Sequence, residues 1–511
     1  MANTGKEGKH NNIVYVFVPF RFDDIEGVMS AAKRRCREGD AVWEDGSKDV
    51  RSYFFKYLTD KISVVGDGGL DCRCCIHLSA KERNLSRDRM RPGDEWNKIL
   101  SAQKGLLGFS MGDVFWLRQP SYMDDTRQKI DFRFHIDSLK LTVFRTGIGL
   151  VSFGLVFEGV DPIEMGAAEF LLKLSIEKLD RTSDYGMRNS IVQMDGAERT
   201  DFATVARGVL ESTIGLGNAQ FNFYSKKPRG NLFSVFIAGE QDDGKDFEKE
   251  LYYLGNGYGV SFMYPGDNKD AVCQLLGAPN VRWCVSNEVA CCLVRPGMHP
   301  PAEGFIYGSF YYKFRCEYLF MYIWLLHQKY ALYAFLTDIS ANGLSVASRE
   351  KADALRNYKR RFTDFEANYV FARVTEVPQY QQLYDAVSKQ FALQTMYDDV
   401  KEPLSALEAL AKDDEVRARE EERRTADGIT KILATLGVLG IASALVDGYD
   451  FIGKFFGCEN SGLAHWVQVC QYACTGAILL FVGWVVMKWL RWIGVGKHKN
   501  GNLNSKEEKR K

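Results

Sequence analysis

The sequence predicts an α+β domain, a long helical stalk and a C-terminal hairpin of two transmembrane helices. Three observations support this fold class. Strand-like and helix-like segments alternate through the first 300 residues. After Pro403 a charged helical segment continues, without a further proline, into an apolar segment that ends at Val446. A second apolar segment, Trp466 to Met487, has 22 residues and no charge, which fits the roughly 20 residues that span a bilayer.

Composition limits the classes of partner. The 511 residues include 66 Lys and Arg and 66 Asp and Glu, so the chain lacks the basic excess of a nucleic-acid-binding protein, and we expect no direct nucleic-acid partner. A strand-like segment follows the polar N-terminus, which is not the pattern of a secretory signal. We therefore expect residues 1–400 to lie in the cytoplasm, where most of the 12 cysteines would be free thiols.

Residues 1–300 are expected to form the α+β domain. The apolar, β-branched segment Ile13 to Phe20 predicts a buried strand, and a helix is expected around Ile25 to Arg37. Alternating residues from Asp131 to Phe157 predict a β-hairpin that turns at Gly147 or Gly149. Further elements are expected at Ala167–Leu179 (helix), Asn231–Gly239 (strand), Asp242–Lys245 (turn) and Arg282–Leu293 (strand pair). The sheet should be largely antiparallel.

Residues 301–402 are expected to form a helical domain. The aromatic-rich segment Tyr311 to Ile339 predicts a long helix, but Lys313, Arg315, Glu317 and His327 would each be costly inside a bilayer, so a buried core helix is favoured over a third span. Two more helices are expected, followed by the stalk helix of residues 403–431, with Pro403 in its first turn. The two are Arg349–Phe371 and Pro378–Val400.

The C-terminal hairpin divides into a first span (residues 432–450), an outer loop (451–465), a second span (466–487) and a basic tail (488–511). Lys454 is the sole Lys or Arg between Ile432 and Met487, whereas eight follow the second span, and positive charge stays on the cytoplasmic side. Both termini are therefore expected in the cytoplasm. A buried core helix is the alternative to the shorter first span.

One face of the first span suits the wall of a pore. At about 100° per residue, six residues fall on that face, and its outer end is acidic. They are Ile432, Leu436, Leu439, Ser443, Asp447 and Asp450. In a ring of subunits the repeated aspartates would form an acidic mouth above a hydrophobic constriction. In a monomer they would simply end the span at the membrane interface.

These features together resemble the CorA superfamily of divalent-cation channels. The segment E-E-E-R-R-T-A-D-G-I-T-K-I-L-A-T-L-G-V-L-G looks like that family's junction between stalk and first span, and the resemblance covers roughly residues 310–495. The family's Gly-Met-Asn signature falls on Gly448, Tyr449 and Asp450, where only the Gly matches. The resemblance implies a homopentamer in the bacterial inner membrane that passes a divalent cation, with the Asp450 carboxylate in place of the Asn carbonyl.

Upstream segments are similar to a divergent CorA-like branch associated with type III CRISPR defence. They are L-T-V-F-R-T-G-I-G-L-V-S-F, W-C-V-S-N-E-V-A-C-C-L and Y-I-W-L-L-H-Q-K-Y-A-L-Y-A-F. This resemblance implies that the cytoplasmic domain binds a nucleotide second messenger, in some systems a conjugate of ATP with S-adenosylmethionine.

Few residues of the cytoplasmic domain point to chemistry on their own. Arg145, Thr146 and Gly147 could bring a side chain and backbone N–H groups to a phosphate, although a plain hairpin turn explains them too. Trp283 and Tyr258 could stack a base or pack in a core. Cys72, Cys74, Cys75 and His77 lack the C-x-x-C spacing of a zinc site, and His327 is expected to be a hydrogen-bonded helix residue rather than a base.

The sequence therefore predicts a ligand-gated, oligomeric membrane channel and no enzyme, since it contains no nucleophile elbow, phosphate-binding lysine loop or metalloprotease motif. No covalent cofactor is expected. Three alternatives stay open: a magnesium transporter of the CorA type, a hydrolase or nuclease tethered by the hairpin, and a structural scaffold.

Overall fold

A computed structural model describes most of the chain before residue 456. It describes residues 11–36, 40, 42–50, 54–59, 61–62, 74–81, 114–118, 131–174, 191–194, 199–226, 228–238, 247–258, 263–265, 274–275, 281–295, 305–341 and 349–455, with isolated positions between 469 and 488. The chain divides into two compact units, Met1–Glu408 and Ala409–Lys511.

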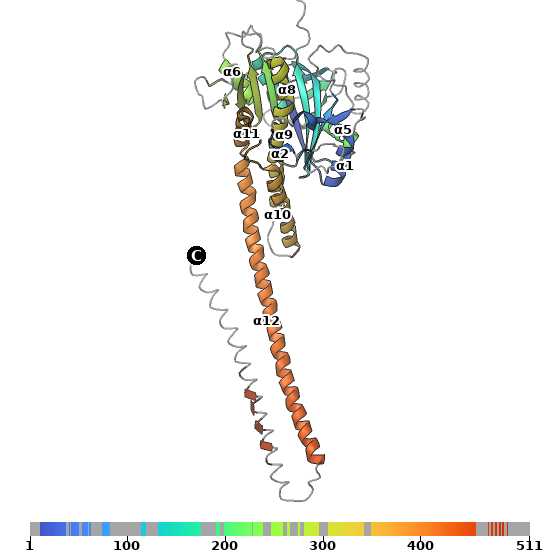
Figure 1. The fold of residues 1–511 in the computed structure, drawn as a ribbon, viewed down its shortest axis with the longest axis vertical. Helices are drawn as coiled ribbons and strands as arrows, with labels where there is room; N and C mark the ends of the chain where they lie inside the picture. Colours follow the sequence, from blue (N-terminus) through green and yellow to red (C-terminus); the bar gives the residue numbers. More distant parts are fainter. Residues whose placement is uncertain are drawn as a thin grey trace, which may run out of the picture. The chain divides into compact units, whose positions relative to one another are not determined.

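The first unit is built on one 12-stranded sheet (Figure 1). Its main path has the order β10-β11-β12-β9-β1-β6-β5-β4-β7-β8, while β3 pairs with both β2 and β5. All pairs are antiparallel except β12 with β9. The strands are β1 (Asn12–Arg21), β2 (Trp43–Asp45), β3 (Cys75–Ala80), β4 (Val114–Arg118), β5 (Asp131–Phe144), β6 (Ile148–Phe157), β7 (Ile191–Met194), β8 (Arg199–Thr200), β9 (Asn231–Ile237), β10 (Gln274–Leu275), β11 (Val281–Val285) and β12 (Val289–Val294). The described part of the first unit is therefore mixed α and β, with a largely antiparallel sheet.

Helices cover both faces of this sheet. On one face Val14, Val16 and Leu232 pack in a core with four helices, α1 (Ile25–Arg35), α4 (Pro162–Leu174), α5 (Phe202–Ile214) and α6 (Phe247–Asn256). Side chains alternate along a strand, so the neighbouring residues Phe17 and Phe233 face the other way, where both contact the Tyr322 ring. The remaining short elements are η1 (Gly46–Val50) and α2 (Lys56–Thr59).

Tyr322 belongs to α9 (Leu319–Ala341), a helix that is buried along most of its length and lies in front of the sheet in Figure 1. It continues a π-helical and helical entry made of η4 (Phe305–Phe310), α8 (Tyr311–Lys313) and η5 (Phe314–Tyr318). The charges in this region are paired: Arg315 donates to Asp137 at 2.6 Å, and the Tyr380 hydroxyl donates to Glu317. The prediction of a buried core helix is confirmed, because partners compensate the buried charges.

The other predicted elements of the described part are confirmed with small shifts at their ends. The β5–β6 turn contains Gly147 at φ 84°, a left-handed conformation that suits glycine. The helix expected at 349–371 is α10 (Arg349–Tyr369). The helix expected at 167–179 is described up to Leu174, and the turn expected at Asp242–Lys245 lies outside the described residues.

The prediction was wrong about where the long helix begins. The helix expected at Pro378–Val400 stops as α11 (Pro378–Gln390), and α12 runs from Leu393 to Phe455. Pro403 therefore lies inside α12 rather than in its first turn. The break falls at Ala392, whose φ is 52°. Alanine is the strongest helix former, so no residue type signals a stop there, and tertiary packing decides the boundary.

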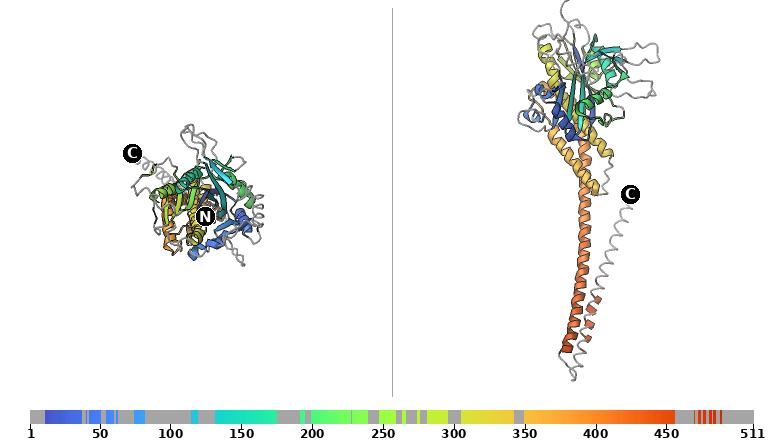
Figure 2. Two further views of the ribbon diagram at one scale, coloured as in Figure 1. Left: turned by 90° about the horizontal axis from the view of Figure 1, so that it is seen from above. Right: turned by 90° about the vertical axis from the view of Figure 1, so that its right-hand side faces the viewer.

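In the first unit, α10 runs beside the start of α12, as the views of Figures 1 and 2 agree. Phe362 stacks on Tyr397 with 5.4 Å between ring centroids, and Lys359 pairs with Glu408. Within the part of the chain that the structure describes, no helix combines the length and the apolarity needed to cross a membrane.

Replacing Arg315 by Met should lower the free energy of unfolding by about 3 kcal/mol, because Asp137 would lose its cationic partner in a largely buried place. Unfolding of the full chain in detergent measures this loss. Arg133→Met is the matched control: its pair with Glu158 spans 3.7 Å and both side chains are nearly half exposed, so a change of less than about 0.5 kcal/mol is expected. Equal effects of the two substitutions would contradict the prediction.

Candidate functional site

A cluster of polar side chains, of which Lys173, Asn231 and Lys329 are buried, gathers around the turn between β11 and β12. The turn forms because the Ser286 hydroxyl accepts a hydrogen bond from Val289 N–H, and Ser286 N–H donates to the Val289 carbonyl at 2.7 Å. Since β9 and β12 run parallel, both begin at the same edge of the sheet, and Leu232 N–H donates to the Glu288 carbonyl at 2.8 Å. We call this group of residues the β11–β12 cluster; it consists of Lys173, Arg229, Asn231, Asn256, Asn287, Glu288 and Lys329.

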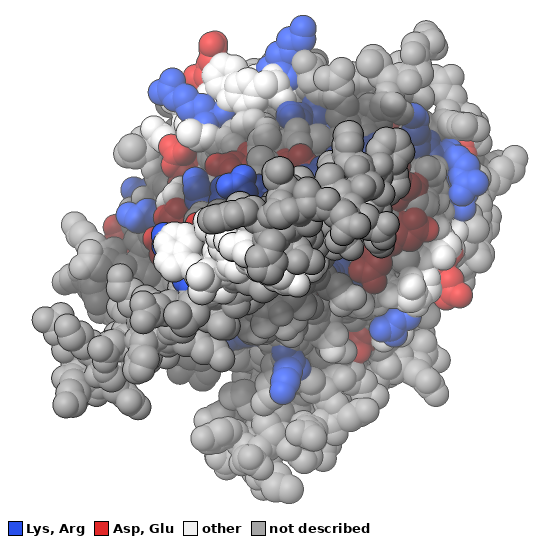
Figure 3. All heavy atoms as spheres, turned by 90° about the horizontal axis from the view of Figure 1, so that it is seen from below, with Lys and Arg blue, Asp and Glu red and all other residues white. Residues whose placement is uncertain are grey.

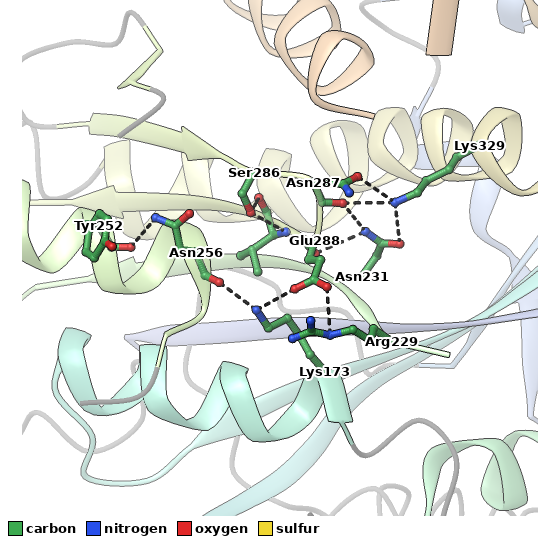
Figure 4. Close-up of polar contacts among 10 residues, drawn as sticks. Lys173, Arg229, Asn231, Tyr252, Asn256, Ser286, Asn287, Glu288 and Lys329 are labelled. Carbon is green, nitrogen blue, oxygen red and sulfur yellow. Dashed lines mark hydrogen bonds and ion pairs between the residues drawn. The ribbon is translucent and has the colours of Figure 1, made fainter. Parts of the chain in front are cut away.

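Two cations hold the carboxylate of Glu288 (Figure 4). Lys173, in the last turn of α4, lies 2.9 Å from one oxygen, and Arg229 lies 3.0 Å from the other. The Lys173 ammonium also donates at 2.8 Å to the carbonyl of Asn256, the last residue of α6. It thereby satisfies a carbonyl that the helix itself leaves free. Lys173 thus joins the ends of two helices to the turn.

Lys329 enters the cluster from α9. Its ammonium donates to the Asn287 carbonyl at 3.1 Å and lies 3.4 Å from the side-chain oxygens of Asn287 and Asn231. The Asn231 side chain accepts a hydrogen bond from the Tyr330 hydroxyl at 2.8 Å and donates to the Asn287 carbonyl at 3.1 Å. Two consecutive residues of α9 therefore hold the first residue of β9 and the turn before β12.

Burial dominates the electrostatics of the cluster. It lowers the pKa of Lys329 to about 8, against a small opposing effect of Glu288. It also lowers the pKa of Lys173, and the neighbouring Glu288 carboxylate counteracts this shift. Both lysines are thus charged groups placed where charge is unfavourable. An arrangement of this kind needs anionic partners, and Glu288 supplies one.

Glu169 lies one helical turn before Lys173 on α4 and is fully buried. Neither carboxyl oxygen has a well-formed hydrogen bond within the described part of the chain. Burial raises its pKa to about 8, while the nearby Ser234 hydroxyl and Lys173 work against the shift. At neutral pH the group is therefore mostly protonated and adds little negative charge to balance the lysines.

The predicted phosphate-binding turn is occupied by protein contacts. Arg145 N–H donates to the Cys74 carbonyl at 3.0 Å, and Gly147 N–H donates to the Phe144 carbonyl at 3.1 Å. The Arg145 guanidinium pairs with Glu26, and Thr146 is hydrogen-bonded to His327 at 2.8 Å. Two of the turn's N–H groups are thus already used, as in a plain hairpin. His327 is a buried, hydrogen-bonded helix residue, as expected.

The predicted ligand residues do not come together. Trp283 on β11 is four strands from β6, or about 19 Å across the sheet from the β5–β6 turn. It is buried against Phe233, Phe314 and Tyr318, so its ring belongs to the core. Tyr258 alone borders the β11–β12 cluster, with the Lys173 ammonium 5.9 Å from its ring centroid.

Elsewhere in the described fold, the candidate polar sites show no arrangement that points to a ligand. A hollow of about 460 Å³ lies between α1 and α5, but Arg35 there donates to the carbonyls of Ser212 and Thr213 and to Asp40. Cys74, Cys75 and His77 are buried, Cys72 lies outside the described residues, and no group of metal-binding side chains occurs among the residues described. In Figure 3 the described basic and acidic side chains are interspersed on the face shown.

The predicted pore residues are described in part. Ile432 and Leu436 lie on α12 with 47% and 58% of their surface exposed. The backbone of Leu439, Ser443, Asp447, Gly448, Tyr449 and Asp450 also belongs to α12, whereas their side chains lie outside the described residues. Their role in a pore stays a prediction.

Sequence patterns did not indicate the β11–β12 cluster, because its members come from five separate segments and form no motif. In the sequence, Lys329 was the one residue that could have indicated this cluster, since a lysine within an almost wholly apolar helix needs a buried partner. Comparison with protein-family models, with curated proteins and with solved structures finds no match to the chain.

Glu169 should make stability depend on pH. Because its pKa is about 8 in the folded chain against 4.5 ordinarily, the folded state retains a proton that the unfolded state loses between these values. Its contribution is fully present below pH 4.5 and is lost as pH rises to 8. Glu169→Gln should remove a slope of at most about 1.4 kcal/mol per pH unit, measured by unfolding of the full chain across this range. The exposed Glu211→Gln should leave the slope unchanged; an unchanged slope in Glu169→Gln would refute the assignment.

Proposed function

We propose that this protein is a homo-oligomeric membrane channel of CorA-like architecture, gated by a ligand that binds its cytoplasmic domain. One observation carries the proposal. The helix α12 continues without a break from Leu393, next to the core of the first unit, to Phe455, beyond the predicted first span. Apart from the one backbone hydrogen bond that Pro403 cannot donate, the helix is continuous, so it can transmit a movement at its root along its length.

Exposed apolar side chains in the second unit support a membrane location. On α12 they follow a charged segment, and further ones lie at the described positions of the second predicted span. They are Ile429, Ile432, Leu433 and Leu436, then Val469, Tyr472, Leu480, Phe481 and Trp484, each between 47% and 77% exposed. So many large apolar side chains in one segment are rarely exposed to water, so lipid or further copies of the chain would cover them.

A ligand can gate the channel only if it binds the open and closed states with different affinity. The first unit is suited to provide that difference, because α9, α10 and α11 all contact the beginning of α12 or the residues just before it. By the resemblance stated above, the ligand is a nucleotide messenger of type III CRISPR defence and the membrane is the bacterial inner membrane.

Ion flux from liposomes tests the proposal. The full chain is reconstituted, and release of a divalent cation is followed with and without candidate nucleotides, including a conjugate of ATP with S-adenosylmethionine. A change in flux on addition of one nucleotide is expected. Binding of a nucleotide without any change in flux, or full biological activity of a fragment without the hairpin, would remove the channel function.

Asp447→Asn and Asp450→Asn should each lower cation flux through the reconstituted channel about tenfold, because each removes a ring of carboxylates from the predicted mouth. Asp427→Asn is the matched control, since it removes a charge from an exposed position upstream on the same helix. Flux that is equal in all three variants would favour the scaffold alternative.

A further inference from the structure

The β11–β12 cluster holds more positive than negative charge. Lys173, Arg229 and Lys329 are three cations, and Glu288 is the one carboxylate that pairs with any of them in the described part of the chain. Lys329 is 5% exposed and donates to neutral oxygens, two of them 3.4 Å away. A buried ammonium without a counter-charge is costly, so a second or stronger anion would stabilise this group.

Glu288 occupies the position that such an anion would take. Its two oxygens bridge Lys173 and Arg229, which come from different segments and converge on one point (Figure 4). Glu288 lies on a turn, its side chain is 27% exposed, and its neighbour Asn287 is exposed. The carboxylate can therefore rotate into water without breaking the strand pairing of β12.

We propose that the β11–β12 cluster is a binding site for the phosphate group of a small soluble ligand, which displaces Glu288 from Lys173 and Arg229. The phosphate would accept hydrogen bonds from Lys173 and Arg229, next to the turn that Lys329 holds. A phosphate has three terminal oxygens and more than one negative charge, so it matches the two converging cations Lys173 and Arg229 better than the single carboxylate does. No covalent step is involved.

The depth of the site selects a small ligand. The Lys173 side chain is 1% exposed, so the headgroup surface of a bilayer or the backbone of a duplex could not reach it. A small molecule with one phosphate group could take the place of the partly exposed Glu288 carboxylate. Tyr258, next to Lys173, offers a ring at the edge of the site for the rest of such a ligand.

Lys329 connects this site to the root of α12. Its ammonium lies 4.3 Å from the centroid of the Phe391 ring, a cation–π contact, and Phe391 immediately precedes Ala392 and the first residue of α12. Ala392 has φ 52°, a strained conformation for a residue with a Cβ. A phosphate that draws Lys329 toward the turn would weaken its contact with Phe391. This last step rests on the proposed channel function, whereas the binding site does not.

Calorimetric titration of the full chain in detergent with pyrophosphate tests the site, with adenosine as a probe that lacks phosphate. Pyrophosphate should bind and adenosine should not. Glu288→Gln should tighten pyrophosphate binding about tenfold, because it removes the competing carboxylate, and the half-exposed Arg229→Gln should weaken it about tenfold. Lys226→Gln is the matched control: it removes an exposed positive charge three residues away, and affinity should be unchanged.

Tighter pyrophosphate binding in Glu288→Gln together with weaker binding in Arg229→Gln distinguishes a binding site from a structural ion pair. If the pair serves the fold alone, both variants lower the unfolding temperature and neither changes affinity, which overturns the proposal. Pyrophosphate that fails to bind wild type and Glu288→Gln alike, or that binds Glu288→Gln no more tightly than wild type, does the same.

A flux measurement on Phe391→Leu separates the site from the channel function. This variant keeps an apolar side chain at the position but loses the ring beneath Lys329. Unchanged pyrophosphate affinity with at least a fivefold smaller ligand effect on flux is expected. If the wild-type chain binds pyrophosphate normally but passes no ions, the proposed binding site stands and the proposed channel function is refuted. If the ligand changes flux through Phe391→Leu as strongly as through wild type, the proposed link through Lys329 is refuted.

Discussion

The burial of α9 is the constraint on which the first unit depends. This helix is apolar on nearly all sides and lies between the sheet and the helices that follow it, so each of its polar side chains needs a partner inside the protein. The partners come from distant segments: Thr146 for His327, Asn231 for Tyr330, and the carbonyl of Tyr369 for Trp324. Satisfying these groups fixes the register of the helix against the sheet more narrowly than apolar contact alone would.

Because of the same constraint, one helix contacts two turns of the sheet. The β5–β6 turn and the β11–β12 turn both lie at the edge where β6, β9 and β12 begin. His327 contacts the first turn and Lys329 the second. Residues two positions apart project to opposite sides of a helix, so α9 lies between the two turns. A change at either turn therefore acts on the helix that packs against Phe391 and the beginning of α12.

Charge in the β11–β12 cluster is unbalanced for a physical reason. Desolvation keeps Glu169 mostly protonated at neutral pH, so this buried acid does little to neutralise the lysines, and among the described residues Glu288 is the carboxylate that pairs with Lys173. A core built only for stability is expected to pair its charges or to omit them. Retention of two buried lysines around a surface turn is therefore the feature of the first unit that most favours recognition of an anion.

Local sequence determined much of this protein. A continuous apolar, β-branched segment located β1, alternation located the β5–β6 hairpin, the strand pair β11–β12 was expected, and the charges of the segment 311–339 indicated a buried core helix. Those features depend on residues close together in the chain. The β11–β12 cluster and the break at Ala392 were decided by the tertiary structure alone. The cluster joins residues more than 150 positions apart, and the break places the best helix former in a left-handed conformation that only the packing of α11 and α12 can impose.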